Sequence, residues 1–264
     1  MLVLRPGALG DTLLAVPALR ALRRRFAPLT LAAQGSAARL LQDLGEVDAA
    51  LAFDDPRVGR LLRGENPEEP VVAWLDAARA PDLRALLVAP SRPSAEVHCS
   101  RYLLETLSPL GVPQDFDESP LRVQPLRSDQ VLIHPGSGSA AKNWPAEHFA
   151  ALTPRLEPVR LIVGEADEYA AAAVEGYLGQ TPQRLESLPL HTLAQRLAGC
   201  CAYVGNDSGV SHLAGLCGAP THVLFGPTSP TMWRPLGPRV NVWDFDVEPH
   251  RLRAEIDRAS GAAA

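Results

Sequence analysis

The chain has 264 residues, of which 46% are hydrophobic and 21% are charged, and its net charge is −5. This composition excludes a globally disordered chain, and the acidic balance disfavours nucleic acid as the partner. The length fits one large or two small domains, each able to bury a core of its own.

Short apolar runs alternate with amphipathic ones in the first 110 residues. Residues 2–5 predict a buried strand, and Asp11 opens a helix that runs to Phe26. Pro17 falls in the second turn of that helix and predicts a kink or a later helix start. Further strands are predicted at 29–33, 49–53, 71–75 and 86–89, and a helix at 95–110 that ends at Gly111.

The pattern breaks between Gly111 and Asp129, where prolines lie among acidic and polar residues, and this segment is the expected linker. Strand–helix alternation then restarts. Strands are predicted at 131–133, 160–163, 202–204, 222–225 and 240–243, and helices at 145–156, 168–178, 190–199, 208–217 and 248–259. Such alternation predicts an α/β fold with two Rossmann-like parallel-sheet domains, whose carboxyl strand ends face a central ligand cleft.

The sequence predicts neither a membrane span nor a secretory signal. No run reaches 18 uninterrupted apolar residues, and Pro6-Gly7 interrupts the first apolar segment at once. The four cysteines form no CxxC pair. This usage predicts a reducing, cytoplasmic compartment and argues against a zinc site.

The first candidate site is the loop Arg5-Pro6-Gly7-Ala8-Leu9-Gly10-Asp11, which follows a strand and precedes a helix. It does not match the GxGxxG dinucleotide fingerprint. Gly7 and Gly10 allow a tight turn and a close approach of the backbone to a substrate. Asp11 has two interpretations, as the N-cap of the helix or as a general base in the cleft.

The second candidate is residues 134–139, His-Pro-Gly-Ser-Gly-Ser, called here the Gly/Ser turn. Ser137, Gly138 and Ser139 can direct backbone N–H groups and hydroxyls onto an anion. Lys142 is the single lysine and precedes a helix opened by Pro145, which suits a diphosphate. The spacing is not that of a P-loop, and a flexible surface turn is the alternative.

The third candidate is the segment 205–212, where Asn206 or Asp207 is expected to cap the next helix. The helix N-terminus presents free N–H groups at Ser208 and Gly209. His212 lies four residues after Ser208, so both side chains share one helix face and can reach the same ligand.

Three weaker features complete the set. Asp167 and Glu168 follow a strand, where an acidic side chain can accept hydrogen bonds from ribose, although a charged first helical turn fits equally. A base could pack at Phe225-Gly226-Pro227. The arginines at 20 and 23–25 predict a solvated face, with contact to anionic lipid as the alternative.

The motifs occur together in five segments: VLRPGALGDTLLAVPALRALRRRF, HCSRYLLETLSPLGV, LIHPGSGSAAKNWPAEHFAAL, VGNDSGVSHLAGLCGAPTHVLFGPTSP and the closing helix. Their content and order resemble the heptosyltransferase family of bacterial lipopolysaccharide synthesis, glycosyltransferase family 9. The resemblance covers both domains and implies the GT-B fold. The implied domains are a shortened acceptor-side domain at 1–128, a nucleotide-sugar domain at 129–246, and a helix at 247–264 with packing on the N-terminal domain as one option.

The resemblance further implies an inverting, metal-independent transferase that uses an ADP-activated heptose and no cofactor. Asp11 corresponds to the catalytic base of the family. By position, Ser137, Ser139 and Lys142 match the diphosphate contacts, Asp167 (with Glu168 as an offset alternative) matches the ribose contact, and Asp207, Ser208, Gly209 and His212 match the helix that meets phosphate and donor sugar.

The implied partners are a nucleotide-sugar donor and a glycolipid or oligosaccharide acceptor. Peripheral contact with the cytoplasmic face of the inner membrane is an option that this acceptor leaves open. Two alternative functions remain: a UDP-sugar transferase or epimerase of the same architecture, and a non-catalytic nucleotide-sugar-binding relative.

Overall fold

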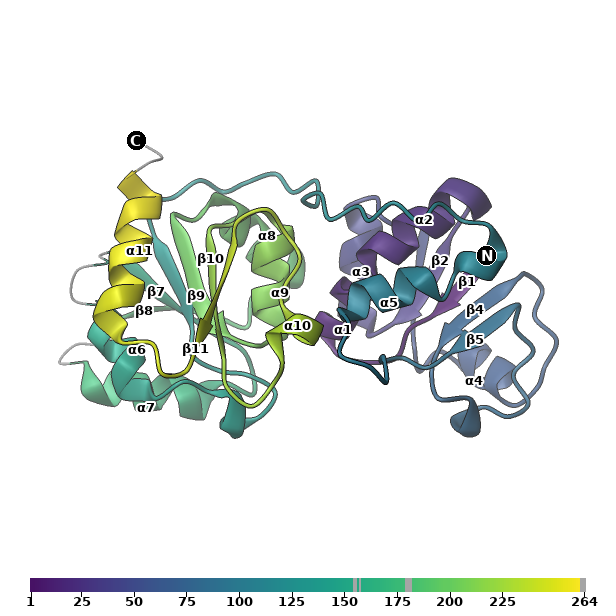
Figure 1. Cartoon of the computed structure of the whole chain (residues 1–264), viewed down its shortest axis with the longest axis horizontal. Helices are drawn as coiled ribbons and strands as arrows, with labels where there is room; N and C mark the ends of the chain where they lie inside the picture. The colour runs from purple at the N-terminus through teal and green to yellow at the C-terminus, as the bar shows by residue number, and fades with distance from the viewer. Residues whose placement is uncertain (154–155, 157, 179–181, 262–264) are drawn as a thin grey trace. The chain divides into compact units, whose positions relative to one another are not determined.

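The structure is a computed structural model that describes residues 1–153, 156, 158–178 and 182–261. It divides into two compact units, Met1–Glu118 and Ser119–Ala264, each a parallel sheet covered by helices (Figure 1). The expected boundary after residue 128 therefore falls inside the second unit. The reason is backbone pairing, because the Leu121 N–H donates to the Leu216 carbonyl at 2.7 Å and the Leu126 N–H to the Gln195 carbonyl at 2.9 Å.

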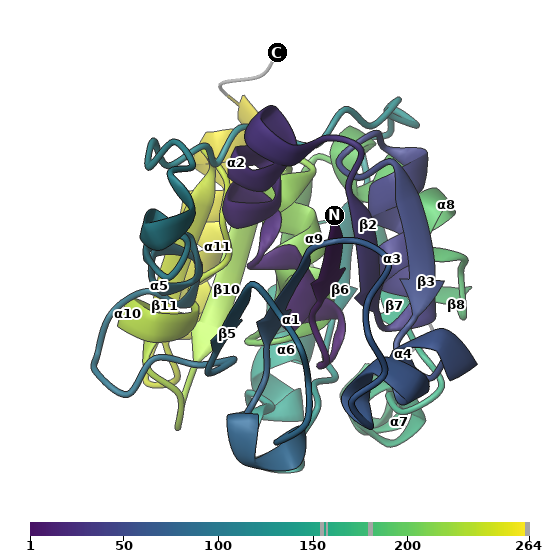
Figure 2. The same ribbon diagram turned by 90° about the vertical axis from the view of Figure 1, so that its right-hand side faces the viewer.

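The first unit contains a five-stranded sheet with the order β3-β2-β1-β4-β5, whose paired strands are all parallel (Figure 2). The strands confirm those predicted for this half of the chain. They are β1 (Leu2–Leu4), β2 (Thr30–Ala33), β3 (Ala49–Ala52), β4 (Val71–Trp74) and β5 (Leu87–Ala89). The helices are α1 (Leu9–Leu13), α2 (Val16–Phe26), α3 (Gly35–Asp43), α4 (Pro56–Leu62) and α5 (Cys99–Glu105), with short 3₁₀ turns η1 (Ala77–Arg79) and η2 (Ser108–Leu110).

The first predicted helix is interrupted as Pro17 suggested. Helix α1 ends at the C-cap Leu14, and α2 restarts from the N-cap Ala15 with the proline in its first turn, where its missing N–H costs no hydrogen bond. The helix predicted at 95–110 is shorter than expected. It splits into α5 and η2, and Gly111 ends the latter with a φ of 64°.

The second unit contains a six-stranded sheet with the order β11-β10-β9-β6-β7-β8, also parallel throughout. The strands are β6 (Val131–His134), β7 (Val159–Val163), β8 (Gln183–Glu186), β9 (Ala202–Asn206), β10 (Thr221–Phe225) and β11 (Val240–Asp244). The helices are α6 (Ala146–Leu152), α7 (Glu168–Tyr177), α8 (Leu190–Gly199), α9 (Gly209–Leu216), α10 (Pro230–Trp233) and α11 (Pro249–Gly261), with a 3₁₀ turn η3 (Ala140–Lys142).

Strand β8, the one-turn helix α10 and the 3₁₀ turn η3 of this unit were not predicted. Strand β8 has no buried residue and reads Gln-Arg-Leu-Glu, so it lacks the apolar signal of its neighbours. The helix predicted at 145–156 is seen as far as Leu152, and its positions 154 and 155 lie outside the described residues.

Helices cover both faces of the second sheet, with α6, α7 and α11 on one face and α8 and α9 on the other (Figure 1). Helix α11 packs on α6, and its Leu252 and Ile256 are fully buried in the core beside Phe149. Burial of two large apolar residues anchors it in the second unit.

Both sheets reverse strand order beside their first strand, between β1 and β4 in the first unit and between β6 and β9 in the second. In open parallel sheets, ligands bind outside the carboxyl ends of the strands at such a switch point. The Asp11 loop follows β1, and the Gly/Ser turn and the Asp207 segment follow β6 and β9. Topology therefore places these three candidate segments at the ligand-binding edges of their sheets.

Within the described part of the chain, no helix is both long and apolar enough to cross a membrane.

Candidate active site

Asn206, the last residue of β9, links the segment that follows β6 to the end of β9 by side-chain hydrogen bonds. Its fully buried amide donates from Nδ2 to the Pro135 carbonyl at 2.8 Å, and its Oδ1 accepts from the Trp144 N–H at 2.8 Å. Both ends of the segment that carries the Gly/Ser turn and Lys142 are thus tied to the end of β9. The sequence offered Asn206 only as a helix cap, and this bridging role was missed.

Lys142 and Asp207 form the charged centre of this edge. The ammonium Nζ lies 3.1 Å from both the Asp207 carbonyl and its Oδ2, and Thr228 donates its hydroxyl to the same Oδ2 at 2.8 Å. His212 Nε2 lies 3.9 Å from Asp207 Oδ1. The structure therefore brings together the predicted residues Lys142, Asp207 and His212, and adds Thr228, which the sequence placed at the end of the base-side segment and not beside Asp207.

Lys142 has one N–H donor left for a hydrogen bond to a ligand. An ammonium has three N–H donors, and two of them face Asp207. The Lys142 side chain is 26% exposed, whereas that of Asp207 is 8% exposed. The remaining donor can therefore serve an anion from the solvent side, beside the N-terminus of α9.

Helix α9 begins differently from the expectation. Ser208 is the N-cap, and its Oγ accepts from the Ser211 N–H at 3.4 Å, so neither Asn206 nor Asp207 caps this helix. The physical reason is that both candidates are occupied elsewhere, Asn206 by the preceding loop and Asp207 by Lys142. The first N–H groups of α9, including that of Gly209, still point out of its N-terminus.

His134 links Asp167 to Ser208 beneath the Gly/Ser turn. Its Nε2 lies 2.9 Å from Asp167 Oδ2 and its Nδ1 lies 3.2 Å from Ser208 Oγ. The imidazole is 4% exposed. The sequence placed His134 in a motif but gave it no role, since nothing local indicates that residues 33 and 74 positions away meet its ring.

Asp167 is held by two contacts at one of its carboxylate oxygens. Its Oδ2 accepts from the Gly164 N–H at 2.9 Å as well as facing His134. Burial alone would raise the pKa of Asp167, but the hydrogen bonds from His134 and Gly164 bring it below its ordinary value. A Cβ at Gly136 would stand 1.9 Å from Asp167 Oδ1, so glycine is needed there for the carboxylate to approach the turn.

Glu168, the alternative to Asp167 as the ribose contact, forms an ion pair with Arg184. Its carboxylate lies 3.0 Å from Arg184, which also pairs with Glu175 at 2.5 Å and with Glu186 at 3.4 Å. The alternative interpretation of a charged first helical turn thus describes Glu168 in this structure.

The hydroxyl of Ser137 is used within its own turn. It lies 2.6 Å from Asn143 Oδ1 and 2.7 Å from the Ser139 carbonyl, and it accepts weakly from the Ser139 N–H at 3.3 Å. Ser137 therefore shapes the turn, while Gly138 and Ser139 are exposed at its tip. The anion contacts that this turn can offer are then backbone N–H groups and the Ser139 hydroxyl.

Of the segment Phe225-Gly226-Pro227, predicted to contact the nucleotide base, only part is exposed. Phe225 is 2% exposed and its ring belongs to the core, so it cannot stack on a base. A Cβ at Gly226 would stand 2.5 Å from the Phe245 ring, which therefore lies directly against this glycine. Gly226 and Pro227 are exposed, and Phe245 is the aromatic side chain that the sequence reasoning missed here.

In the first unit, Asp11 is the third residue of α1 and not its N-cap. Its Oδ2 accepts from the N–H of the N-cap residue Ala8 at 3.1 Å, so a capping role exists from inside the helix. Gly7 has a φ of +132°, and a Cβ there would stand 2.7 Å from Asp11 Cβ. Gly7 is thus required both for the turn and for the place of the carboxylate.

Arg5 lies behind Asp11 and is fully buried. Its Nε donates to the Asp11 carbonyl at 3.1 Å, its Nη1 donates to the Ser91 carbonyl at 3.0 Å, and its Nη2 lies 3.6 Å from Asp11 Oδ1. Burial lowers the pKa of Arg5, against the attraction of Asp11 and Cys99. The Asp11 carboxylate, 19% exposed, therefore stands over a buried cation at the switch point of its sheet.

Three of the four arginines of α2 pair with acidic side chains. Arg20 pairs with Glu46 and Asp117, and two further arginines of this group pair likewise. Those pairs are Arg23 with Asp48 and Arg24 with Asp115. Paired charges of this kind weaken the interpretation of a lipid-binding patch.

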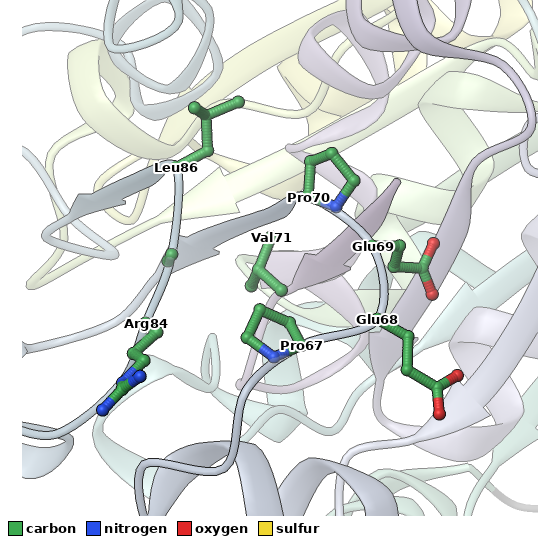
Figure 3. Close-up of a pocket in the computed structure, with 8 residues that line it drawn as sticks. Pro67, Glu68, Glu69, Pro70, Val71, Arg84 and Leu86 are labelled. Carbon is green, nitrogen blue, oxygen red and sulfur yellow. The ribbon is translucent and has the colours of Figure 1, made fainter.

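A cavity of about 510 Å³ opens in the first unit between the segments that precede β4 and β5 (Figure 3). Pro67, Pro70 and Leu86 line it, together with Glu68 and Arg84. Since Val71 begins β4 and pairs with Leu2, this cavity lies at the amino ends of the strands. It is at the opposite edge of the sheet from Asp11 and holds none of the predicted site residues.

Comparison with known proteins identifies the family. The sequence pattern described as glycosyltransferase family 9 (heptosyltransferase) matches residues 101–259, more than half of the chain. The chain belongs to glycosyltransferase family 9.

Individual relatives of this family 9 protein match over shorter stretches. It is 31% identical over 148 residues to lipopolysaccharide heptosyltransferase 2 of Salmonella typhimurium, covering 52% of this chain and 42% of that protein. It is 36% identical over 104 residues to lipopolysaccharide heptosyltransferase 1 of Pseudomonas aeruginosa, covering 38% of this chain and 29% of that protein. The matched stretch thus spans less than half of these curated relatives.

Solved structures show the fold over the whole family 9 chain. A family 9 glycosyltransferase of Veillonella parvula superimposes with a TM-score of 0.81 at 17% identity, covering 99% of this chain and 97% of that chain. The ADP-heptose lipopolysaccharide heptosyltransferase II of E. coli gives 0.78 at 20% identity, covering 99% and 98%. The predicted fold class, two parallel α/β domains of GT-B type, is confirmed.

Proposed function

We propose that this protein transfers a sugar of the heptose type from an ADP-sugar to a hydroxyl of a saccharide or glycolipid acceptor. The observation that carries the proposal is the Lys142 ammonium, held 3.1 Å from Asp207 beside the N-terminus of α9 at the switch point of the second sheet. Membership of family 9 supports the transferase class. The names of the relatives support the heptose and, for the E. coli structure, its ADP form.

The diphosphate is assigned to Lys142, the backbone of the Gly/Ser turn and the first N–H groups of α9. As the glycosidic bond to the donor breaks, negative charge grows on the leaving phosphate, and fixed positive groups stabilise it. These groups take the place that a metal ion has in other transferases, so we propose metal-independent transfer.

The donor sugar is assigned to the side of Asp207 and His212, which face each other at 3.9 Å. A ribose contact by Asp167 would use Oδ1, because Oδ2 already receives Gly164 and His134. The base is assigned to the exposed Gly226-Pro227 segment, with Phe245 in place of the buried Phe225.

The proposed reaction is a direct displacement. Asp11 takes the proton of the acceptor hydroxyl, the freed oxygen attacks the anomeric carbon, and ADP leaves from the opposite face with both electrons of the broken C–O bond. The anomeric configuration is therefore inverted. General base catalysis by a positioned carboxylate contributes roughly 10²–10⁴-fold to such a step.

Two measurements test this function. Isothermal titration calorimetry with ADP and UDP tests the donor, and ADP binding without UDP binding supports the proposal. Incubation with ADP-heptose and a heptose-deficient lipopolysaccharide acceptor, followed by mass spectrometry and NMR of the product, tests transfer and inversion. Preference for UDP would favour the UDP-sugar alternative, and ADP binding without transfer would favour the non-catalytic one.

A further inference from the structure

A hydrogen-bonded chain runs through the second unit from the start of α7 to the start of α9. Asp167 Oδ2 lies 2.9 Å from His134 Nε2, and His134 Nδ1 lies 3.2 Å from Ser208 Oγ. The imidazole is 4% exposed, the Asp167 side chain is 13% exposed, and Ser208 is buried. The chain thus connects an ionisable pair to the N-cap of the helix assigned to the diphosphate.

The protons in this chain are fixed by the carboxylate. The pKa of Asp167 lies below its ordinary value, because hydrogen bonds from His134 and Gly164 outweigh the effect of burial, so the group is an anion at neutral pH. An ionised carboxylate only accepts, which requires a proton on His134 Nε2. His134 Nδ1 is then an acceptor when the ring is neutral and a donor when it is protonated.

The direction of the Ser208 hydroxyl follows from the state of that ring. With neutral His134, the Ser208 proton must point to Nδ1, since a buried nitrogen without a partner is costly. Its oxygen then offers only lone pairs, which repel a phosphate. With protonated His134, Nδ1–H donates to Ser208 Oγ and releases the Ser208 O–H to donate elsewhere.

Ser211 does not take the place of Ser208 as the hydrogen-bond donor to the imidazole, because its proton is used elsewhere. Its own hydroxyl donates to the Asn206 carbonyl, and its oxygen lies 2.9 Å from the Tyr203 hydroxyl and 3.3 Å from Ser208 Oγ. Burial raises the pKa of Tyr203, so this phenol stays neutral. Ser208 is therefore the side chain through which protonation of His134 reaches the N-terminus of α9.

We propose that the donor diphosphate binds to the protonated form of His134, which turns the Ser208 hydroxyl toward a phosphate oxygen, and that nucleoside diphosphate binding takes up a proton. His134 is then a positioning residue that acts through Ser208. The charged and titratable groups around this chain are Asp167 from α7, Tyr203 from β9, and Asp207, which Lys142 holds. The inference rests on the proposed function, because it needs a diphosphate at α9.

The test is calorimetry of ADP binding in two buffers of equal pH whose ionisation enthalpies differ. The difference in observed heat counts the protons taken up. The wild-type protein is expected to take up as much as one proton per ADP, and its affinity is expected to fall as the pH rises, by as much as tenfold per pH unit. His134→Gln keeps an uncharged hydrogen-bonding side chain and reports the titration of ADP itself.

The variants separate the proposed coupling from a structural role. Ser208→Ala removes the hydroxyl and is expected to bind ADP more weakly with little proton uptake. His191→Gln, at an exposed position on α8, is the matched control and is expected to behave as wild type. Proton uptake by His134→Gln equal to that of wild type would overturn the proposal.

The wild-type data decide the question even if a variant fails to fold. Heat of ADP binding that is equal in both buffers from pH 6.5 to 8.5 overturns the coupling and leaves the donor assignment intact. Absence of any ADP binding refutes the donor assignment, and the coupling with it.

Discussion

Replacing Lys142 with alanine removes the single lysine of the chain and leaves Asp207 without its cation. Lys142 directs two donors at Asp207 and keeps one for a ligand. The variant therefore changes the diphosphate site in two ways. It deletes a positive charge, and it leaves an unneutralised carboxylate, 8% exposed, close to the N-terminus of α9.

The expected loss of ADP affinity follows from the first of these changes. A hydrogen bond to a charged group contributes about 1.5–3 kcal/mol. Since about 1.4 kcal/mol corresponds to a factor of ten, Lys142→Ala should weaken ADP binding by about 10–100-fold. Repulsion between Asp207 and the diphosphate adds to this loss, so the upper part of the range is expected.

A double-mutant cycle separates the two contributions. Asp207→Asn keeps a polar partner for Lys142 and Thr228 but removes the negative charge, so ADP affinity should change by only a few-fold. The double variant Lys142→Ala/Asp207→Asn should bind ADP more tightly than Lys142→Ala alone. Arg251→Ala removes an exposed positive charge from α11 and is the control for overall charge.

Calorimetry with ADP at low ionic strength measures these affinities, and thermal unfolding followed by circular dichroism confirms that each variant is folded. Unchanged ADP affinity in a folded Lys142→Ala protein would remove Lys142 from the site and refute the reasoning. An equal loss for Arg251→Ala would attribute the effect to net charge alone.

Four further expectations follow from the geometry. Asp11→Asn should lower the transfer rate by roughly 10²–10⁴-fold with unchanged ADP affinity, and a rate within a few-fold of wild type would show that the base lies elsewhere. Asn206→Ala leaves buried backbone groups unpaired and should lower the free energy of unfolding by about 2–5 kcal/mol in urea, whereas an unchanged midpoint would contradict its bridging role. The pKa of Asp167 is lowered in the folded state, so its stabilisation is present at neutral pH and is lost as the pH falls below about 4. Urea unfolding across this range should show a smaller loss in acid for Asp167→Asn, and parallel curves would argue against it. Transfer should persist in EDTA, and activity lost in EDTA and restored by Mg²⁺ would favour a different transferase mechanism.

Most of the fold could be predicted from the sequence because its signals are local. Among the residues that the structure describes, apolar runs marked ten of the eleven strands, and Pro17 marked the break between α1 and α2. The exception is β8, whose four polar or half-buried residues carry no apolar pattern. Its place in the sheet depends on pairing with β7, which local sequence does not encode.

The motifs placed Asp11, Lys142, Asp207 and His212 after the right strands, because ligand loops follow the carboxyl ends of parallel strands in any such fold. The sequence by itself therefore determined the fold class, the family and the segments that form the candidate site. Only the tertiary structure decided what each side chain in those segments does. The Asn206 side chain hydrogen-bonds to the loop after β6 and so cannot cap α9. Ser208 is the N-cap instead.

The same reason explains why Phe225 is buried and why Asp167 pairs with His134. The Phe225 ring is buried by packing in the second unit. Asp167, at the N-cap of α7, lies next to β6 and therefore meets His134 at the end of that strand. A hydrogen bond or a buried surface needs two partners, and these partners are distant in the chain. Local sequence encodes how each segment folds, whereas the register of β6, β7, β9 and β10 decides which segments meet.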